Sequence, residues 1–272
     1  MQLSLGFSPC PNDTYIFHGL VSGRVALPGC TLQEVLHDVE TLNRLAFDQV
    51  LDVTKLSFYA WLMVRRHYRL LDSGAALGFG CGPLVISRKR LTRDDMGDCR
   101  IVLPGCWTTA HLLFRLWAPE AQQRRFLTYD RIFEALNEGT ADCGVIIHES
   151  RFTFQQAGFR PVIDLGAWWE ARTGLPIPLG GIAVHRRVPE SVAAQLEAGI
   201  RQSIELARRS PQAAGDYIRR HAQEMHPEVL QAHIDTYVNA FSLELGAVGR
   251  SAIDALEQEA VQAGLLPADA QE

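Results

Sequence analysis

Segments with the pattern of a strand and segments with the pattern of a helix follow one another along the first part of the chain. Residues 3–7 alternate as a strand does, residues 8–13 form a turn rich in proline, and residues 14–21 have a helical pattern. Further strand and helix patterns follow in alternation, at 31–36, 41–47, 50–56 and 58–66. This order predicts an α/β fold with a largely parallel sheet.

Two similar apolar segments, 83–87 and 181–185, bracket a second unit of the same kind. Within that unit strand and helix patterns alternate, at 100–103, 109–117, 126–129, 130–138 and 143–148. The C-terminal part carries helical patterns, at 191–208, 227–240 and 251–263. A chain of 272 residues has room for about two domains. We therefore predict that residues 88–180 are inserted into a domain made of residues 1–87 and 181–272, with a ligand cleft between the two.

Composition excludes several classes of protein. The net charge of −5 argues against a nucleic-acid partner, because such proteins show a basic stripe. No apolar run approaches the ~18 residues of a membrane helix, and residues 1–7 do not read as a targeting signal. We expect a cytoplasmic protein with no membrane partner. The sequence does not predict the oligomeric state.

Metal sites of the common kinds are not indicated either. The six cysteines contain no Cys-x-x-Cys pair, and the nine histidines contain no His-Glu-x-x-His pair. The glycine-rich segment 74–82 lacks the Gly-Lys-Ser/Thr ending of a phosphate loop. We expect no metal and no cofactor.

Three junctions between a strand and a helix place small polar side chains where a helix begins, at 8–14, 54–57 and 105–110. A helix start has unpaired backbone N–H groups and a partial positive charge, so it binds carboxylates. In parallel sheets these junctions lie at the carboxyl ends of strands, where ligands bind. The alternative is that Ser57 and Thr109 only cap their helices. Several junctions that line one cleft favour carboxylate binding.

His148 ends the apolar strand pattern that begins at Cys143, and Glu149 follows it. A histidine at the carboxyl end of a strand faces the same crevice, and its ordinary pKa of about 6.5 suits a general base. The alternative is a histidine whose nitrogens are satisfied by the backbone. Cys10 next to a helix start is a weaker nucleophile candidate, because Pro9 and Pro11 on either side of it indicate a turn.

Six segments, taken in order, resemble the 1,4-dihydroxy-6-naphthoate synthase family of the futalosine route to menaquinone. They are Phe7-Ser8-Pro9-Cys10-Pro11-Asn12-Asp13-Thr14, Asp38-Val39-Glu40-Thr41-Leu42-Asn43, Thr54-Lys55-Leu56-Ser57, Ile147-His148-Glu149-Ser150-Arg151-Phe152-Thr153, Asp164-Leu165-Gly166-Ala167-Trp168-Trp169 and Tyr237-Val238-Asn239-Ala240-Phe241-Ser242. The resemblance runs from about residue 3 to residue 265. Each segment alone has modest specificity, and the ordered set is strongly specific.

The resemblance implies a fold similar to type II periplasmic binding proteins. It implies a lyase that fragments the small-molecule carboxylate cyclic dehypoxanthine futalosine without a cofactor, with His148 as proton acceptor. The residues that it implies contact the substrate are Lys55, Leu56, Ser57, Thr109 and Ala110. Further candidates for the site are Asn12, Asp13, Asp38, Asn43 and Thr108. Among the acidic residues, Asp13, Asp38 and Glu149 are candidates for orienting His148.

Two other functions remain open from the sequence. The same fold would serve a non-catalytic protein that binds small carboxylates, because fold does not determine function. A chorismate dehydratase is the other candidate, since that enzyme is similar in fold. The segment from His148 to Arg151 favours the synthase.

Overall fold

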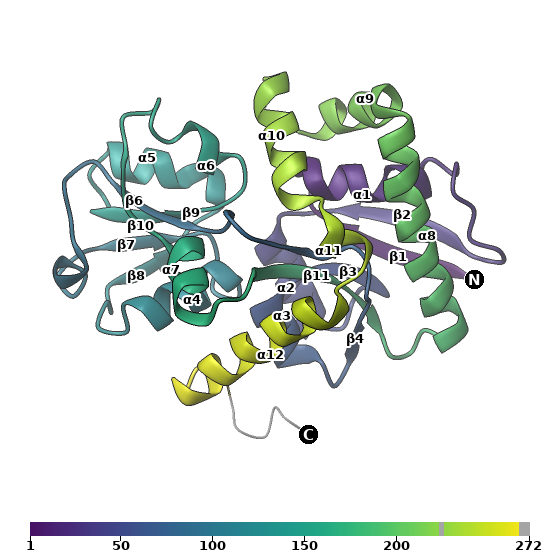
Figure 1. Ribbon diagram of the computed structural model, residues 1–272, viewed down its shortest axis with the longest axis horizontal. Helices are drawn as coiled ribbons and strands as arrows, with labels where there is room; N and C mark the ends of the chain where they lie inside the picture. Colours follow the sequence, from purple (N-terminus) through teal and green to yellow (C-terminus); the bar gives the residue numbers. More distant parts are fainter. Residues whose placement is uncertain (223–225, 267–272) are drawn as a thin grey trace.

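Two β-sheets lie side by side in the computed structural model, which describes residues 1–222 and 226–266 (Figure 1). The first sheet has the order β2-β1-β3-β11-β4, and β5 also pairs with β11. Its strands are β1 (Gln2–Phe7), β2 (Thr31–Leu36), β3 (Val53–Ser57), β4 (Tyr68–Leu70), β5 (Ala76–Gly78) and β11 (Ile177–His185). The second sheet has the order β10-β6-β9-β7-β8. Its strands are β6 (Leu84–Ser87), β7 (Ile101–Leu103), β8 (Arg124–Phe126), β9 (Cys143–Ile146) and β10 (Arg160–Asp164).

The helices cover both sheets, and the predicted α/β class is confirmed. Around the first sheet lie α1 (Pro11–Val21), α2 (Val39–Phe47), α3 (Phe58–Val64), α8 (Glu190–Arg209), α9 (Pro211–His221), α10 (Pro227–Tyr237) and α11 (Ala240–Leu243). With the second sheet lie α4 (Thr109–Trp117), α5 (Ile132–Asn137), α6 (Ser150–Thr153) and α7 (Leu165–Thr173). The last helix, α12 (Gly246–Gln262), contacts β11 of the first sheet and α4 of the second unit.

The prediction of a largely parallel sheet was wrong, because both sheets are mixed. β1 runs parallel to β2 and β3, and β7 runs parallel to β8 and β9. In contrast, β11 is antiparallel to β3, β4 and β5, and β6 is antiparallel to β9 and β10. A parallel pair needs a crossover connection, usually a helix. β6 and β11 instead enter their sheets from the other unit of the protein, and they run against their neighbours.

The chain crosses between the sheets twice, after β5 and before β11. Residues 83–87 were predicted to belong to the first domain, but β6 pairs with β9 and β10 in the second sheet. Pairing with β9 is complete from Leu84 to Ser87, so the strand is an integral part of that sheet. The first crossing therefore lies ahead of β6.

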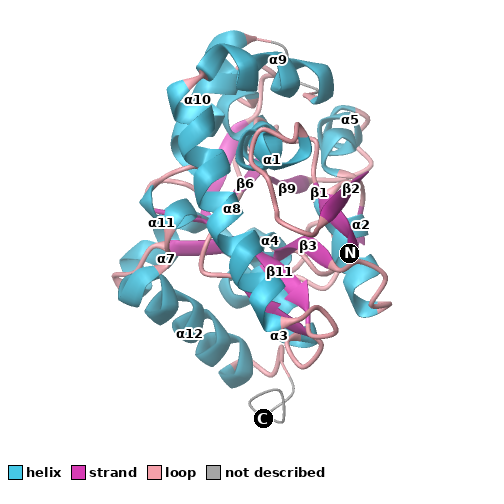
Figure 2. Ribbon diagram, turned by 90° about the vertical axis from the view of Figure 1, so that its right-hand side faces the viewer, coloured by secondary structure: helices cyan, strands magenta, loops and turns pink. Residues whose placement is uncertain are grey.

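The first helix positions two candidate site residues. It begins at Pro11, three residues before the predicted start, because proline suits the first position of a helix. Asn12 and Asp13 consequently lie in its first turn and are buried. The helix packs against α8, α9 and α10, and Figure 2 shows this layer beside the first sheet. α10 is thereby held close to the start of α1.

Among the described residues, no helix combines the length and the apolar character that crossing a membrane requires.

A methyl group at Gly166 would overlap the backbone carbonyl oxygen of Cys81. Gly166 lies at the start of α7, and Cys81 lies in the first crossing between the sheets. We expect Gly166→Ala to lower the free energy of unfolding by about 1–3 kcal/mol, since backbone atoms cannot move aside cheaply. Denaturant titration measures this loss. Gly97→Ala is the matched control, because a methyl group there meets open space. Equal stabilities of the two variants would contradict the packing described.

Candidate active site

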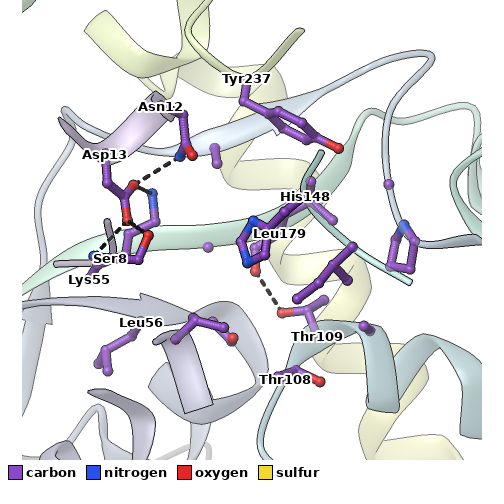
Figure 3. Close-up of a pocket in the computed structure, with 18 of the residues that line it drawn as sticks. Ser8, Asn12, Asp13, Lys55, Leu56, Thr108, Thr109, His148, Leu179 and Tyr237 are labelled. Atoms are coloured by element: carbon purple, nitrogen blue, oxygen red, sulfur yellow. Dashed lines mark hydrogen bonds and ion pairs between the residues drawn. The ribbon is translucent and has the colours of Figure 1, made fainter. Parts of the chain in front are cut away.

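A pocket lies between the two sheets and holds about 640 Å³ of space, part of it open to solvent. The ends of four strands meet there: Ser8 follows β1, Ser57 ends β3, Thr108 and Thr109 follow β7, and His148 follows β9. The other lining residues are Asn12, Asp13, Val39, Lys55, Leu56, Ala76, Gly82, Pro83, Ala110, Ile147, Leu179, Gly180, His233 and Tyr237. Figure 3 shows most of them.

Helix α4 begins at the pocket wall with Thr109 and Ala110. The hydroxyl of Thr109 donates to the carbonyl oxygen of Leu179 (2.7 Å) and accepts from the amide of Tyr59 (3.3 Å). The amides of the first turn have no carbonyl group one turn earlier to bind, so they can serve an anion in the pocket. Thr108 caps the helix by accepting from the amide of His111 (3.2 Å).

The alternative that Ser57 and Thr109 act only as caps was wrong. Ser57 occupies the position before α3 but makes no side-chain capping bond. Thr109 is the first residue of α4 itself, and its neighbour Thr108 is the cap. Both residues therefore line the pocket, and neither hydroxyl caps the helix that begins at its own position.

Asn43 holds Ser57 from behind and does not line the pocket. Its side-chain oxygen accepts from the amide of Ser57 (3.0 Å), and its side-chain nitrogen donates to the Ser57 hydroxyl oxygen (3.1 Å). The same nitrogen donates to the carbonyl oxygen of Trp107 (3.3 Å). The Ser57 hydroxyl is thus an acceptor toward Asn43, which leaves its hydrogen for a ligand.

Glu40 fastens the loop in front of α4. Its two carboxylate oxygens accept from the amides of Cys106 and Trp107, each at 3.0 Å. Burial raises the pKa of Glu40, and these two backbone bonds oppose the rise. Asp38 caps α2 by accepting from the amides of Glu40 and Thr41 (3.0 and 3.1 Å). Asp38 does not line the pocket, and capping accounts for its place in the structure.

A buried ion pair joins Asp13 and Lys55 at 3.1 Å on one side of the pocket. The Asp13 carboxylate also accepts from the Ser8 hydroxyl (2.7 Å) and from the Asn12 side-chain nitrogen (2.9 Å). The Lys55 ammonium donates further to the carbonyl oxygen of Gly74 (3.4 Å). A buried charge pair with this many hydrogen bonds is compensated, so it forms a rigid polar wall.

His148 is the second residue after β9 and lies in the left-handed backbone region, with φ of 57°. A residue other than glycine rarely adopts this conformation, and such strain is concentrated at functional sites. Burial is the largest influence on the pKa of His148, and it lowers that pKa below its ordinary value. The ring is therefore neutral at neutral pH and can accept a proton.

Two aromatic side chains flank His148. The rings of Tyr129 and His148 form an edge-to-face contact with centroids 5.0 Å apart, and the ring of His233 lies nearly parallel to that of His148 at 6.2 Å. His233 and Tyr237 come from α10, and the sequence analysis did not assign a role in the site to either of them. Tyr237 lay within a segment that carried the family resemblance, but nothing in the sequence pointed to His233.

No three of the described His, Cys, Asp and Glu side chains are grouped so that they could hold a metal ion.

Nine of the predicted site residues therefore line the pocket, and two lie outside its lining. The nine are Asn12, Asp13, Lys55, Leu56, Ser57, Thr108, Thr109, Ala110 and His148. The two are Asp38 and Asn43, which hold the backbone around the pocket. Their roles in binding and catalysis stay predictions.

Comparison of sequences connects the whole chain to one family. The profile of a menaquinone biosynthesis family matches residues 3–262. A 1,4-dihydroxy-6-naphthoate synthase of Thermus thermophilus is 49% identical over 263 residues, which covers 97% of this chain and 95% of the relative. The enzyme of the same name from Streptomyces coelicolor is 39% identical and covers 98% of this chain and 95% of its own.

Comparison of structures agrees with the predicted fold. Protein AF1704 of Archaeoglobus fulgidus superposes with a TM-score of 0.92 at 29% identity, over 97% of this chain and 98% of its own. The alkanesulfonate-binding protein SsuA of Xanthomonas axonopodis pv. citri gives a TM-score of 0.74 at 18% identity, over 98% and 94% of the two chains. The prediction of a fold like that of periplasmic binding proteins is confirmed.

His111 lies in the first turn of α4, and its titration tests how this part of the pocket wall is buried. Its Nδ1 lies 2.7 Å from the carbonyl oxygen of Cys106, and burial lowers its pKa to about 4. The unfolded chain, with a pKa of about 6.5, binds the proton more tightly, so stability is lost as pH falls below 6.5. We expect His111→Phe to reduce the stability difference between about pH 7 and about pH 5 by roughly 1–2 kcal/mol. Denaturant titrations at both pH values measure it. An unchanged difference would show that the folded protein accepts the proton on His111 readily.

Proposed function

The chain belongs to the menaquinone biosynthesis family and is an enzyme, and from this premise we propose that it is a 1,4-dihydroxy-6-naphthoate synthase acting on cyclic dehypoxanthine futalosine. The observation that carries the proposal is the neutral His148 in a pocket that also contains the start of α4. In such a pocket, one side binds the carboxylate of the substrate, and the histidine on the other side accepts a proton from the substrate.

The carboxylate of the substrate is proposed to bind at the start of α4. The amides of Thr109 and Ala110 and the hydroxyl of Ser57 are donors on this wall, and all three residues are almost fully buried. Donors that are fixed by other bonds lose little freedom on binding. Thr109 is fixed by Leu179 and Tyr59, and Ser57 is fixed by Asn43.

His148 is proposed to remove the proton that starts the fragmentation. The reaction class is that of a lyase: loss of the proton leads to an aromatic bicycle and to release of the piece derived from the sugar. A base that is neutral at working pH has its lone pair free for this step. Enclosure of the ring in the pocket keeps water from competing for the same proton.

Both proposed domains contribute residues to this pocket. Lys55 and Ser57 lie on β3 of the first sheet, and Thr109 and His148 follow β7 and β9 of the second sheet. We propose that binding of the substrate across this boundary brings base and substrate together. We also propose that the enzyme works in the cytoplasm, since its small-molecule carboxylate substrate belongs to a biosynthetic pathway.

His148→Gln is expected to lower turnover about 10²- to 10⁴-fold, because the general base is removed. Product formation from cyclic dehypoxanthine futalosine, followed by mass spectrometry, measures the loss. Circular dichroism of the variant is expected to match that of the parent. Turnover close to normal would remove His148 from the mechanism. Conversion of chorismate in place of the futalosine derivative would identify the dehydratase, and binding of either compound without turnover would identify a binding protein.

Ser57→Ala and Thr108→Ala are expected to separate binding from stability. Ser57 makes no capping bond, so Ser57→Ala should mainly raise KM, with about 1.5–3 kcal/mol of binding lost to a charged group. The Thr108 hydroxyl caps α4, so Thr108→Ala should lower the free energy of unfolding by about 1 kcal/mol. Steady-state kinetics and melting temperatures measure the two effects. A fall in melting temperature alone for Ser57→Ala would exclude a role in binding.

A further inference from the structure

Two buried polar atoms face each other beside the pocket without a hydrogen bond. They are Nδ1 of His233 and Oε2 of Glu149, and they lie 4.0 Å apart. The side chain of His233 is 1% exposed and that of Glu149 is 13% exposed. An unpartnered polar atom in such a place costs free energy, so an arrangement that satisfies both atoms is favoured.

The protonation of His233 follows from its other nitrogen. Nε2 of His233 lies 2.9 Å from Oδ1 of Asn12, and Nδ2 of Asn12 donates to Asp13. The Asp13 carboxylate is paired with Lys55 and accepts hydrogen bonds, which fixes the orientation of the Asn12 amide. Since Oδ1 of Asn12 can only accept, Nε2 of His233 carries the hydrogen. A neutral ring then has a bare lone pair on Nδ1.

The partner of that lone pair must be a donor, and a carboxylate is not one. Neither atom is accessible to solvent, so one proton on the carboxyl group is the simplest solution. A proton on both ring nitrogens is disfavoured, because burial and the nearby Lys55 and His148 hold the pKa of His233 well below its ordinary value. The proton therefore belongs on the carboxyl oxygen.

We propose that in the resting enzyme Glu149 carries a proton and donates it to Nδ1 of His233, and that this bond makes His233 a positioning residue for His148. A slight turn of the Glu149 side chain would close the 4.0 Å gap to hydrogen-bond length. The role in turnover rests on the proposed function, whereas the hydrogen bond itself does not.

The effect reaches the base through ring packing. The described structure contains no hydrogen bond to the ring of His148, which contacts the ring of Tyr129 in a T-shaped arrangement and stacks on that of His233. The plane of His233 is in turn fixed by Asn12 at one nitrogen and by Glu149 at the other. Loss of the Glu149 bond frees the ring of His233, and with it one of the two neighbours that hold His148.

The first test is nuclear magnetic resonance of the protein labelled with ¹⁵N-histidine, without substrate. His111 supplies the internal reference, because its Nε2 is buried without a partner. We expect the Nδ1 signal of His233 to show a hydrogen-bonded lone pair in the parent and in Glu149→Gln, whose amide is also a donor. In Glu149→Leu the signal should move to the position of an unbonded nitrogen. An unbonded Nδ1 or a doubly protonated ring in the parent would overturn the proposal.

The second test compares the turnover of the same variants. Glu149→Gln should keep kcat within about threefold, and Glu149→Leu should lower it about tenfold, as expected for one lost hydrogen bond in the site. His18→Gln is the control, since Nδ1 of His18 is also buried without a partner but lies outside the pocket. Equal losses in Glu149→Gln and Glu149→Leu would show that the negative charge is needed, which contradicts the proposal. If the parent has no synthase activity, the proposed function fails and the resonance result still decides the hydrogen bond.

Discussion

The pocket depends on the carboxylate of Glu40, which reaches from α2 across to the loop in front of α4. Two backbone amides, those of Cys106 and Trp107, bind its two oxygens. Hydrogen bonds to an ionised group are stronger than neutral ones, and a buried carboxylate needs them to offset its loss of water. Gly105 is required beside it, because any side chain there would overlap Glu40. This contact and the bonds of Asn43 fix the first turn of α4 against Ser57, so the wall that is proposed to bind the anion exists before any ligand arrives.

The opposite side of the pocket is built differently. It contains a strained backbone position and a row of buried polar side chains, whereas the first wall consists of backbone groups fixed by hydrogen bonds. His148 holds a left-handed backbone conformation, and its ring is placed by packing and not by hydrogen bonds. Behind it runs a chain of paired groups, from Lys55 through Asp13 and Asn12 to His233. These groups are hydrogen-bonded or ion-paired with one another, and none of these printed bonds involves the ring of His148.

Local patterns in the sequence predicted much of this arrangement, and the errors have physical causes. The strand β2 and the helix α4 were predicted with the bounds that the structure has, because their patterns are regular. Strands of three residues, such as β4 and β5, are too short to show alternation, and the direction of β11 is set by the crossing of the chain. In the site, Ser57 and Thr109 could be predicted, because a strand end followed by a helix start is visible locally. His233 could not be, because α10 reaches the pocket only through its packing on α1.

The fold alone does not explain why this protein is an enzyme and not only a binding protein. A binding protein for alkanesulfonates shares the fold at 18% identity, so strand-end junctions around a pocket are compatible with binding and nothing more. In this chain we propose that the difference lies in the residues that follow β9. The strand ends beside a histidine whose strained backbone turns it toward the pocket, and burial keeps that histidine neutral. In the proposed mechanism, an anion held at α4 reacts only if a base of this kind stands near its acidic carbon. We therefore propose that the strained backbone at His148 separates a reaction from binding, and that the buried bonds around it make that strain tolerable.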